Sequence, residues 1–186
     1  DNLGNVGTSP RNAPIDLHAF DVANVWDPQE VDNGWVVNLE GADDATTGIW
    51  ERIDPIGTAA QPEDDHTPSG TMCWITGQHP GGTMGANDID DGTTTLYSTE
   101  YNLSGASQAK AKYWRWYSNN QGNAPNQDAW VVQVRNNGGA WVEVENNQDN
   151  QNSWVNVGFD LYAEFGGFLG NVQLKFIGSD LGSGSV

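Results

Sequence analysis

Two alternating segments joined by a glycine-containing turn constrain the fold more than any other part of the chain. The segments AWVVQVR (129–135) and AWVEVE (140–145) have an apolar residue at nearly every second position, and NNGG (136–139) separates them. Period-two alternation is typical of a strand with one buried face. Asn and Gly tolerate the positive φ angles that tight hairpin turns require. The sequence therefore predicts an antiparallel hairpin, with Trp141, Glu143 and Glu145 on one face of its second strand.

Further short strands are predicted elsewhere, whereas no segment has convincing amphipathic helical periodicity. The predicted strands cover residues 71–76, 93–98, 112–119, 153–161 and 171–176. The connections between them are long and rich in Gly, Asn, Asp and Thr. Many short antiparallel strands with long loops predict an all-β fold, specifically a two-sheet antiparallel jelly-roll sandwich.

Length and composition indicate how the chain is organised. A chain of 186 residues suits one domain with a proper core. We expect a jelly-roll domain over 31–186 and an irregular N-terminal segment over 1–30 packed on the sandwich, within which 17–22 is a candidate edge strand. The many Gly and Trp residues and the scarcity of Lys are typical of a secreted, extracellular all-β protein.

The charge of the chain excludes two classes of partner. Its 25 acids and 7 bases give a net charge of -18. Such a charge disfavours binding to a nucleic-acid backbone or an anionic membrane, and no apolar run is long enough for membrane insertion. Most of the negative charge lies in residues 1–100. An acidic surface that favours solubility in salty water and a set of divalent-cation sites both account for it.

The segment KYWRWYSN (112–119) suggests a ligand-binding face. Its alternation separates Tyr113, Arg115 and Tyr117 from Trp114 and Trp116. Because arginine is seldom buried without a partner, we expect the tryptophans in the core and the Tyr-Arg-Tyr face in an open groove. Such groups stack on sugar rings and grip hydroxyls or carboxylates, although an ordinary outer face covered by loops is the alternative. The candidate ligand-binding residues are Tyr113, Arg115, Tyr117, Gln133, Arg135 and Trp141.

Catalytic motifs are absent from the sequence. The Glu-x-Asp-x-x-Glu strand pattern of one class of jelly-roll glycosidases does not occur, and neither does Gly-x-Ser-x-Gly or His-Glu-x-x-His. Three histidines are scattered along the chain, and Gln78 adjoins His79 without the middle residue of the triplet found in alginate lyases. We therefore expect a protein that is not an enzyme, with polysaccharide-active enzyme as the least favoured alternative.

Four acidic segments are candidates for a calcium site. They are residues 40–48, 50–55, 63–67 and 87–92. Calcium takes six to eight oxygen ligands from carboxylates, carbonyls and water. Asp90 belongs to a partial EF-hand pattern, but the position that should hold the final glutamate is occupied by Ser98, so an EF-hand is excluded. Each segment alone could be a solvated loop, yet we expect at least one of them to bind calcium.

Several ordered motifs resemble a known family. DDATTGIWERIDP, QPEDDHTPSGTMCWITGQ, YWRWYSN and DAWVVQVRNNGGAWVEVE follow one another in residues 34–186. This region resembles the MAM-like, concanavalin-like jelly-roll accessory module of secreted bacterial multidomain proteins, as found beside zinc carboxypeptidases. The resemblance implies a non-catalytic sandwich stabilised by calcium at the aspartate of an Asp-x-Thr loop. The candidate metal ligands are Asp65, with Thr67, Glu51, Asp43, Asp44 and Asp90 as weaker matches.

Relatives in that family continue after GSDLGSGS with a strand that carries an acidic pair. We therefore also consider that a neighbouring chain supplies a strand to an open sheet edge. The expected function is a non-catalytic extracellular module that binds polysaccharide or targets an attached protein. The alternative is an adhesion or assembly module that self-associates through the open edge.

Overall fold

The computed structural model describes residues 25–181. Within that range the chain forms ten strands and one helix of four residues, and the strands pair antiparallel. The prediction of an all-β chain with antiparallel sheets is confirmed. Most of the expected N-terminal segment 1–30, including the candidate strand at 17–22, lies outside the described residues. No helix among the described residues is long and apolar enough to cross a membrane.

The largest sheet has six strands in the order β1-β4-β10-β7-β8, with β5 paired to β10 beside this path. Strand β10 lies at its centre, where Phe176 pairs with Leu96 on one side and with Val132 on the other. The six strands are β1 (Val36–Val37), β4 (Gly92–Tyr97), β5 (Tyr101–Asn102), β7 (Trp130–Asn136), β8 (Val142–Asn147) and β10 (Asn171–Asp180).

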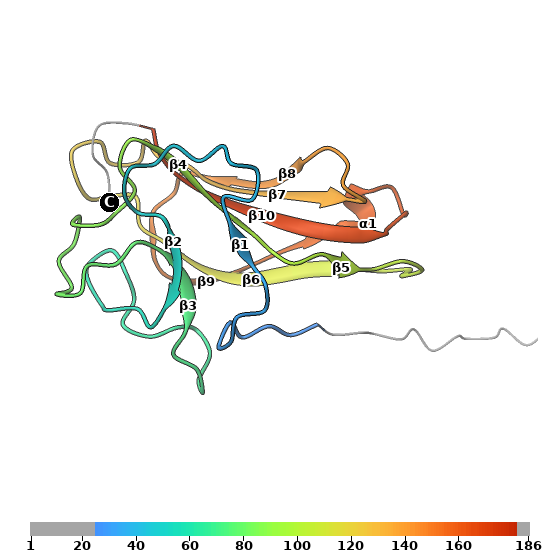
Figure 1. Ribbon diagram of the computed structural model, residues 1–186, viewed down its shortest axis with the longest axis horizontal. Coiled ribbons are helices and arrows are strands. Elements are labelled where there is room, and N and C mark those ends of the chain that lie inside the picture. The colour runs from blue at the N-terminus through green and yellow to red at the C-terminus, as the bar shows by residue number, and fades with distance from the viewer. Residues whose placement is uncertain (1–24, 182–186) are drawn as a thin grey trace, which may run out of the picture.

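Two smaller strand pairs complete the architecture. Strand β6 (Lys110–Tyr117) pairs with β9 (Gln151–Asp160), and β2 (Trp50–Ile53) pairs with β3 (Cys73–Thr76). Figure 1 shows the β6–β9 pair running across from β7, β8 and β10, with β2 and β3 at one end of the molecule. Strand β9 leads directly into α1 (Leu161–Glu164), because the Asp160 side chain caps the first turn of this helix.

The predicted hairpin is confirmed as β7 and β8. Asn137 and Gly138 have φ angles of 52° and 64°, and the amide of Gly139 donates to the carbonyl of Asn136 at 3.0 Å. Two consecutive residues with positive φ match the right-handed twist of the flanking strands, which explains why Asn and Gly occupy this turn.

A β-bulge in β8 changes the faces that simple alternation predicts. Val132 pairs with Glu145 and the next residue, Gln133, pairs with Glu143, so Val144 is an extra residue in β8. Glu143 is exposed, whereas Glu145 turns inward, with its side chain 11% exposed. The expectation that Glu143 and Glu145 share a face is therefore wrong, because one inserted residue reverses the alternation.

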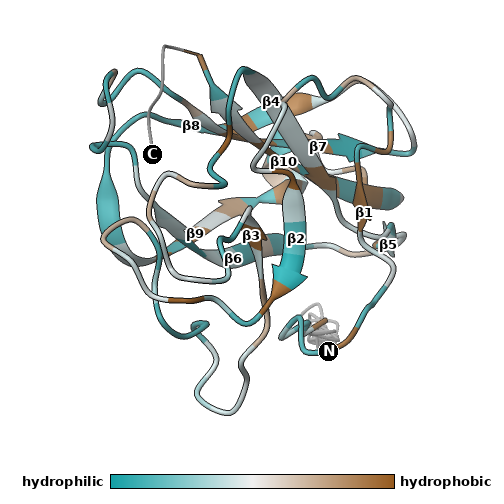
Figure 2. Cartoon of the chain, turned by 60° about the vertical axis from the view of Figure 1, so that its left-hand side comes forward, coloured by the Kyte–Doolittle hydropathy of each residue, from teal (hydrophilic) through white to brown (hydrophobic). Residues whose placement is uncertain are grey.

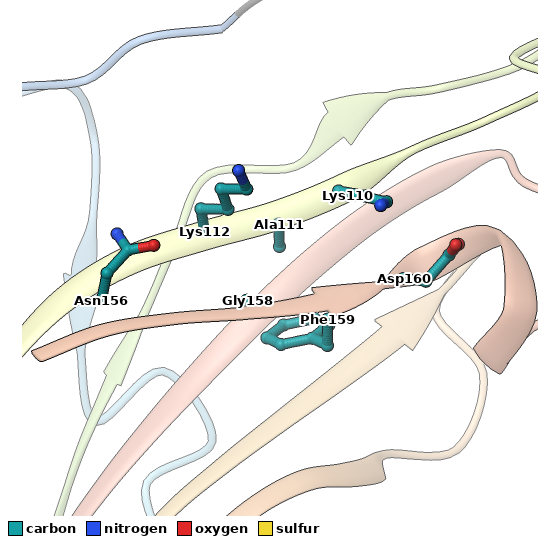
Figure 3. Close-up of a pocket in the computed structure, with 7 residues that line it drawn as sticks. All are labelled: Lys110, Ala111, Lys112, Asn156, Gly158, Phe159 and Asp160. Carbon is teal, nitrogen blue, oxygen red and sulfur yellow. The ribbon is translucent and has the colours of Figure 1, made fainter.

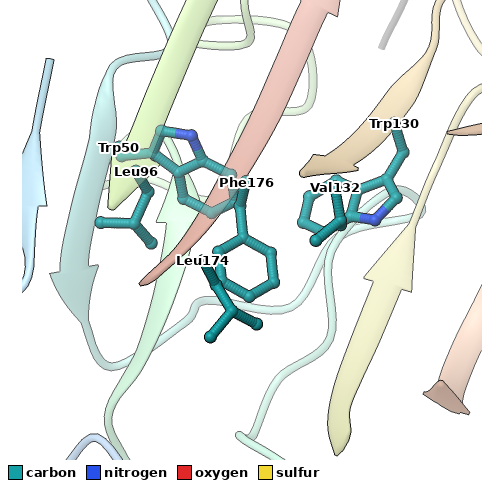
Figure 4. Packing of buried hydrophobic residues seen from close by; sticks show 6 residues of the cluster. All are labelled: Trp50, Leu96, Trp130, Val132, Leu174 and Phe176. Carbon is teal, nitrogen blue, oxygen red and sulfur yellow. The ribbon is translucent and has the colours of Figure 1, made fainter. Parts of the chain in front are cut away.

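The core lies between the large sheet and the smaller pairs. Its main buried cluster consists of Trp50, Leu96, Trp130, Val132, Leu174 and Phe176 (Figure 4). Trp50 packs edge-on against Trp130, with ring centroids 5.8 Å apart. In Figure 2 apolar segments of β7 and β10 lie near the centre of the molecule and hydrophilic loops surround them.

Strand β6 presents the opposite face to the core from the one that the sequence predicts. Arg115 is only 7% exposed, and the ring of Tyr113 packs edge-on against Phe176 at 5.2 Å. Tyr117 also packs against the main cluster, whereas Trp114 points outward and is 40% exposed. The expected orientation is therefore wrong, because Arg115 is buried with a partner that the sequence pattern does not reveal.

That partner is Glu145, which joins β6 of one strand pair to β8 of the large sheet. Arg115 Nε lies 2.8 Å from Glu145 Oε1. Glu145 Oε2 accepts a hydrogen bond from Trp130 Nε1 at 3.0 Å and another from the hydroxyl of Tyr113. Burial, and then the neighbouring Glu145, raises the pKa of the Tyr113 phenol, so this hydroxyl stays protonated and donates. The carboxylate thus satisfies donors from both sides of the core.

We predict that Glu145→Gln lowers the free energy of unfolding by about 3 kcal/mol, because it leaves the Arg115 guanidinium buried without a counter-charge. Glu143→Gln makes the same chemical change two residues away on the exposed face and should shift stability by less than about 0.5 kcal/mol. Urea unfolding of both variants measures the difference. Equal effects of the two substitutions would contradict the structural role given to Glu145.

Candidate functional site

The outward side chains of β6 and β9 form a surface that contains both rings and charges. Because the odd-numbered residues of β6 enter the core, the even-numbered ones face outward. Across the pair, Trp114 lies opposite Asn156 and Lys112 lies opposite Gly158. We call this surface the β6–β9 outer face. It consists of His66 from the loop 61–70 and of the strand residues Lys110, Lys112, Trp114, Trp116, Trp154, Asn156, Gly158 and Asp160.

The aromatic rings of this face hold one another in place. His66 stacks on Trp114 with ring centroids 3.6 Å apart and an interplanar angle of 14°. Trp154 contacts His66 edge-on at 5.9 Å and Trp116 edge-on at 6.1 Å. Trp116 Nε1 donates to the carbonyl of Ala60 at 3.1 Å. The loop before β3 therefore fixes the rings, while a large part of Trp114 stays open to solvent.

A surface depression of about 420 Å³, a volume within the range of small-molecule sites, lies on the same strand pair, and Asn156 in its lining is the strand partner of Trp114. A Cβ atom at Gly158 would come within 3.0 Å of Lys112 Cγ, so glycine at this position leaves room in the depression. Figure 3 shows Lys112 and Asn156 pointing to the same side of the strand pair, whereas Phe159 points to the other side. The lining residues are Lys110, Ala111, Lys112, Asn156, Gly158, Phe159 and Asp160.

The sequence-predicted ligand-binding residues divide between two places. Tyr113, Arg115 and Tyr117 point into the core, so they do not form the expected open groove. Burial raises the pKa of Tyr117, and its buried hydroxyl has no hydrogen-bond partner within the range that the structure describes. Trp114, which the sequence interpretation placed in the core, takes the exposed position instead.

The remaining predicted residues, Gln133, Arg135 and Trp141, belong to the large sheet and its hairpin. The Arg135 guanidinium lies 4.5 Å from the centre of the Trp141 ring. Trp141 Nε1 donates to Glu40 Oε1 at 2.8 Å, and this bond, followed by one from Lys175, lowers the pKa of Glu40 despite partial desolvation. Protein groups thus already occupy the ring face and the charges at this location.

Asp65, the leading metal candidate, is buried at 9% exposure in the loop 61–70. Its Oδ1 atom has no hydrogen-bond partner among residues 25–181. Asp65 Oδ2 lies close to Gly70. A Cβ atom added to Gly70 would come within 3.0 Å of Asp65 Oδ2 and would collide with Glu30 Oε1. Two carboxylates from distant parts of the chain therefore face one small space that glycine leaves open.

Glu30 is fixed in that position by backbone donors. Its carboxylate accepts bonds from the amides of Thr71 and Met72, each at 3.2 Å. The thiol of Cys73 lies in the same negatively charged region. Burial, followed by the charges of Asp65, Asp54 and Glu30, raises the pKa of this thiol to about 12. No sequence motif links Glu30 to Asp65, so sequence reasoning missed this residue.

The carboxylate groups of Asp65 and Glu30 are of the kind that binds calcium. A hard cation prefers carboxylate oxygens, and it would satisfy the Oδ1 atom of Asp65, which no donor in the described part of the chain reaches. Residues 25–181 contain no group of three or more His, Cys, Asp or Glu side chains arranged to hold a metal. Carbonyl oxygens and water would therefore supply the remaining ligands.

Two of the other predicted metal ligands bond to β4. Asp43 accepts from the amide of Thr95 at 2.7 Å and from its hydroxyl at 2.5 Å. Asp44 accepts from the amide of Thr93 at 2.9 Å. These carboxylates fasten the loop 38–48 to the edge of β4, which gives them a structural role.

Two of the remaining three candidates, Asp90 and Glu51, lie apart from the Asp65–Glu30 pair. Asp90 accepts from the Thr47 hydroxyl at 2.9 Å, and Glu51 lines a second depression with Gln78 and other residues. Thr67 stays in the Asp65 loop, where its carbonyl accepts from the amide of Gly70 at 2.9 Å. The structure thus groups Asp65 with Glu30 and Thr67 rather than with the other predicted acids.

No family model matches the chain, and neither a curated protein nor a solved structure matches it. The resemblance of residues 34–186 to a MAM-like module therefore stays a prediction.

Asp88, in the acidic segment 87–92, has a raised pKa, first because of burial and then because of the charges of Asp90 and Asp180. A carboxyl group whose pKa is higher in the folded state destabilises the fold wherever it is ionised. We therefore predict that Asp88→Asn raises the melting temperature at pH 7. This gain should shrink as the pH falls through the raised pKa and vanish below the ordinary value of 3.8.

Thermal unfolding between pH 3 and pH 7 tests this prediction. Asp64→Asn serves as the control, because Asp64 is exposed and the same substitution there should leave the melting temperature unchanged at every pH. A lower melting temperature for Asp88→Asn at pH 7 would contradict the expected sign.

Proposed function

We propose that this protein is a non-catalytic extracellular module that binds carbohydrate through its β6–β9 outer face and is stabilised by calcium. We further propose that its strands form a jelly-roll sandwich of the MAM-like kind. The observation that carries the binding proposal is the exposed ring of Trp114, braced by His66 beside the depression at Gly158.

Sugars suit this surface for a physical reason. One face of a pyranose ring is lined by C–H groups that pack well on an indole, while its hydroxyls need polar partners at the edge. Trp114 offers the indole, and Lys112 and Asn156 offer donors and an acceptor next to it. Because His66 already restrains Trp114, ordering this side chain on binding costs less entropy than ordering a free one.

The small number of acidic groups that line the depression supports a binding role rather than a hydrolytic one. Glycoside hydrolysis generally needs two carboxyl groups on opposite sides of the scissile bond. Among the residues that line the depression, Asp160 is the single acid. Its Oδ1 atom accepts from the amides of Tyr162 and Ala163, so this carboxylate is engaged in capping α1.

The calcium proposal rests on Asp65 and Glu30. A bound cation would neutralise two facing carboxylates and tie the segment around residue 30 to the loop 61–70. The loop also carries His66, the residue directly after Asp65, which stacks on Trp114. Asp65 would therefore anchor the loop from within while its neighbour braces the binding surface from outside.

We predict that Trp114→Ala weakens polysaccharide binding by roughly tenfold or more, because it removes the stacking surface. Affinity electrophoresis through gels that contain single plant or marine polysaccharides measures the effect. Trp141→Ala is the matched control, since it removes an indole from the outer face of the other sheet. The carbohydrate proposal fails if the wild-type protein migrates unretarded in every polysaccharide, or if only Trp141→Ala loses binding.

We also predict that calcium raises the melting temperature and that EDTA lowers it. A ligand at a hundred times its dissociation constant stabilises by about 2.7 kcal/mol, which corresponds to roughly 5–10 °C for a chain of this size. Asp65→Asn should abolish the response, whereas Asp64→Asn should keep it. An unchanged wild-type melting temperature with both calcium and EDTA would disprove the calcium site.

A further inference from the structure

We propose that the β6–β9 outer face selects anionic carbohydrates, whose carboxylate or sulfate groups are recognised by Lys112 and Lys110. This inference rests on the proposed carbohydrate-binding function and names the class of ligand. Positive charge is scarce in this chain, which has 25 acids and 7 bases, so its location matters for ligand choice.

Four of the six Lys and Arg side chains between residues 25 and 181 already have partners. Arg115 pairs with Glu145 at 2.8 Å, and Lys175 and Arg135 approach Glu40 at 3.1 Å and 3.6 Å. The remaining arginine between residues 25 and 181 is Arg52, and it donates to a backbone carbonyl at 3.2 Å.

Lys110 and Lys112 differ from those residues. Both are exposed, and neither ammonium group has an ion pair or a hydrogen bond with any residue in the described part of the chain. In a chain with 25 acids and 7 bases, two adjacent unpaired ammonium groups on one strand face are available to an external anion. An exposed ammonium group is also a compact charge with three rotatable donors, which suits both carboxylates and sulfates.

The lysines lie where a stacked sugar would present its substituents. Lys112 is two residues from Trp114 on the same face of β6 and lies opposite Gly158, which has no side chain. Lys110 follows at the far end of the depression. A pyranose ring on Trp114 would therefore extend its ring substituents toward the two ammonium groups.

Asp160, the acid that lines the depression, forms no ion pair with Lys110 or Lys112 among residues 25–181. Asp160 lies opposite Lys110 in the strand register, but its Oδ1 atom accepts from the amides of Tyr162 at 3.0 Å and Ala163 at 3.1 Å. The net charge of the chain is also unevenly distributed. Residues 1–100 hold 18 acids and 2 bases, a balance of -16, while residues 101–186 hold 7 acids and 5 bases, a balance of -2. The sequence half that supplies the β6–β9 pair is thus close to neutral.

Matched polymers that differ only in charge test the inference. Affinity electrophoresis would compare polygalacturonate with its methyl ester, and carrageenan with its desulfated form, so that carboxylate and sulfate recognition are separated. We expect at least one charged polymer to bind roughly tenfold more tightly than its neutral partner. Binding should weaken as the salt concentration rises from about 50 mM to about 500 mM, because salt screens exposed charges.

Variants then assign the selectivity to this face. Lys112→Gln should weaken binding of the charged polymer by roughly three- to tenfold, and Lys112→Arg should retain most of it. Lys175→Gln makes the same charge change on the other sheet and should leave binding unchanged. The melting temperature of each variant confirms that it is folded.

The outcomes separate this inference from the function on which it rests. Equal binding of charged and neutral polymers, unaffected by Lys112→Gln, overturns the selectivity and leaves carbohydrate binding in place. Equal losses from Lys112→Gln and Lys175→Gln also overturn it, because the effect would then reflect overall charge. A wild-type protein that binds none of the polymers, charged or neutral, overturns both proposals.

Discussion

The buried pair between Arg115 and Glu145 determines which surface of the molecule is available for binding. It requires the odd-numbered face of β6 to enter the core, where Glu145 from β8 meets it at 2.8 Å. The even-numbered face, with Lys112 and Trp114, must then point outward. A charge pair in a core contributes little net stability compared with well-packed apolar residues, but an unpaired charge there costs several kcal/mol. Its main effect is therefore on specificity, because it disfavours any arrangement that separates the partners.

The loop 61–70 connects the two locations on which the functional proposals rest. Its Asp65 turns inward to the space shared with Glu30, and the next residue, His66, turns outward to stack on Trp114. Two consecutive side chains of one loop thus make an interior and an exterior contact. Whatever restrains Asp65 also restrains the ring that braces the β6–β9 outer face.

The sequence predicts local features well and long-range pairings poorly. The hairpin of β7 and β8 and the strands β3, β4, β6, β9 and β10 follow from alternation and turn chemistry. The orientation of β6 could not be predicted, because it depends on Glu145 and hence on a bulge that alternation does not reveal. The roles of the acidic residues could not be predicted either. Asp43 accepts a hydrogen bond from β4, whereas Asp65 Oδ1 has no hydrogen-bond partner among the described residues. Strand β2 is not among the predicted strands, because its short WERI sequence has no clear period and belongs to one of the four acidic segments.

The bulge at Val144 also affects which register of β8 against β7 is stable. If β8 slipped by one residue against β7, the interior position of Glu145 would be taken by Val144 or Asn146, neither of which can neutralise a guanidinium. In most hairpins a slip exchanges apolar and polar faces and is rejected by the hydrophobic effect alone. Here a slipped hairpin would also leave an uncompensated charge in the core. The inserted residue thus brings Glu145 within reach of Arg115, so the register of β8 against β7 is set by a charge pair as well as by the burial of apolar side chains.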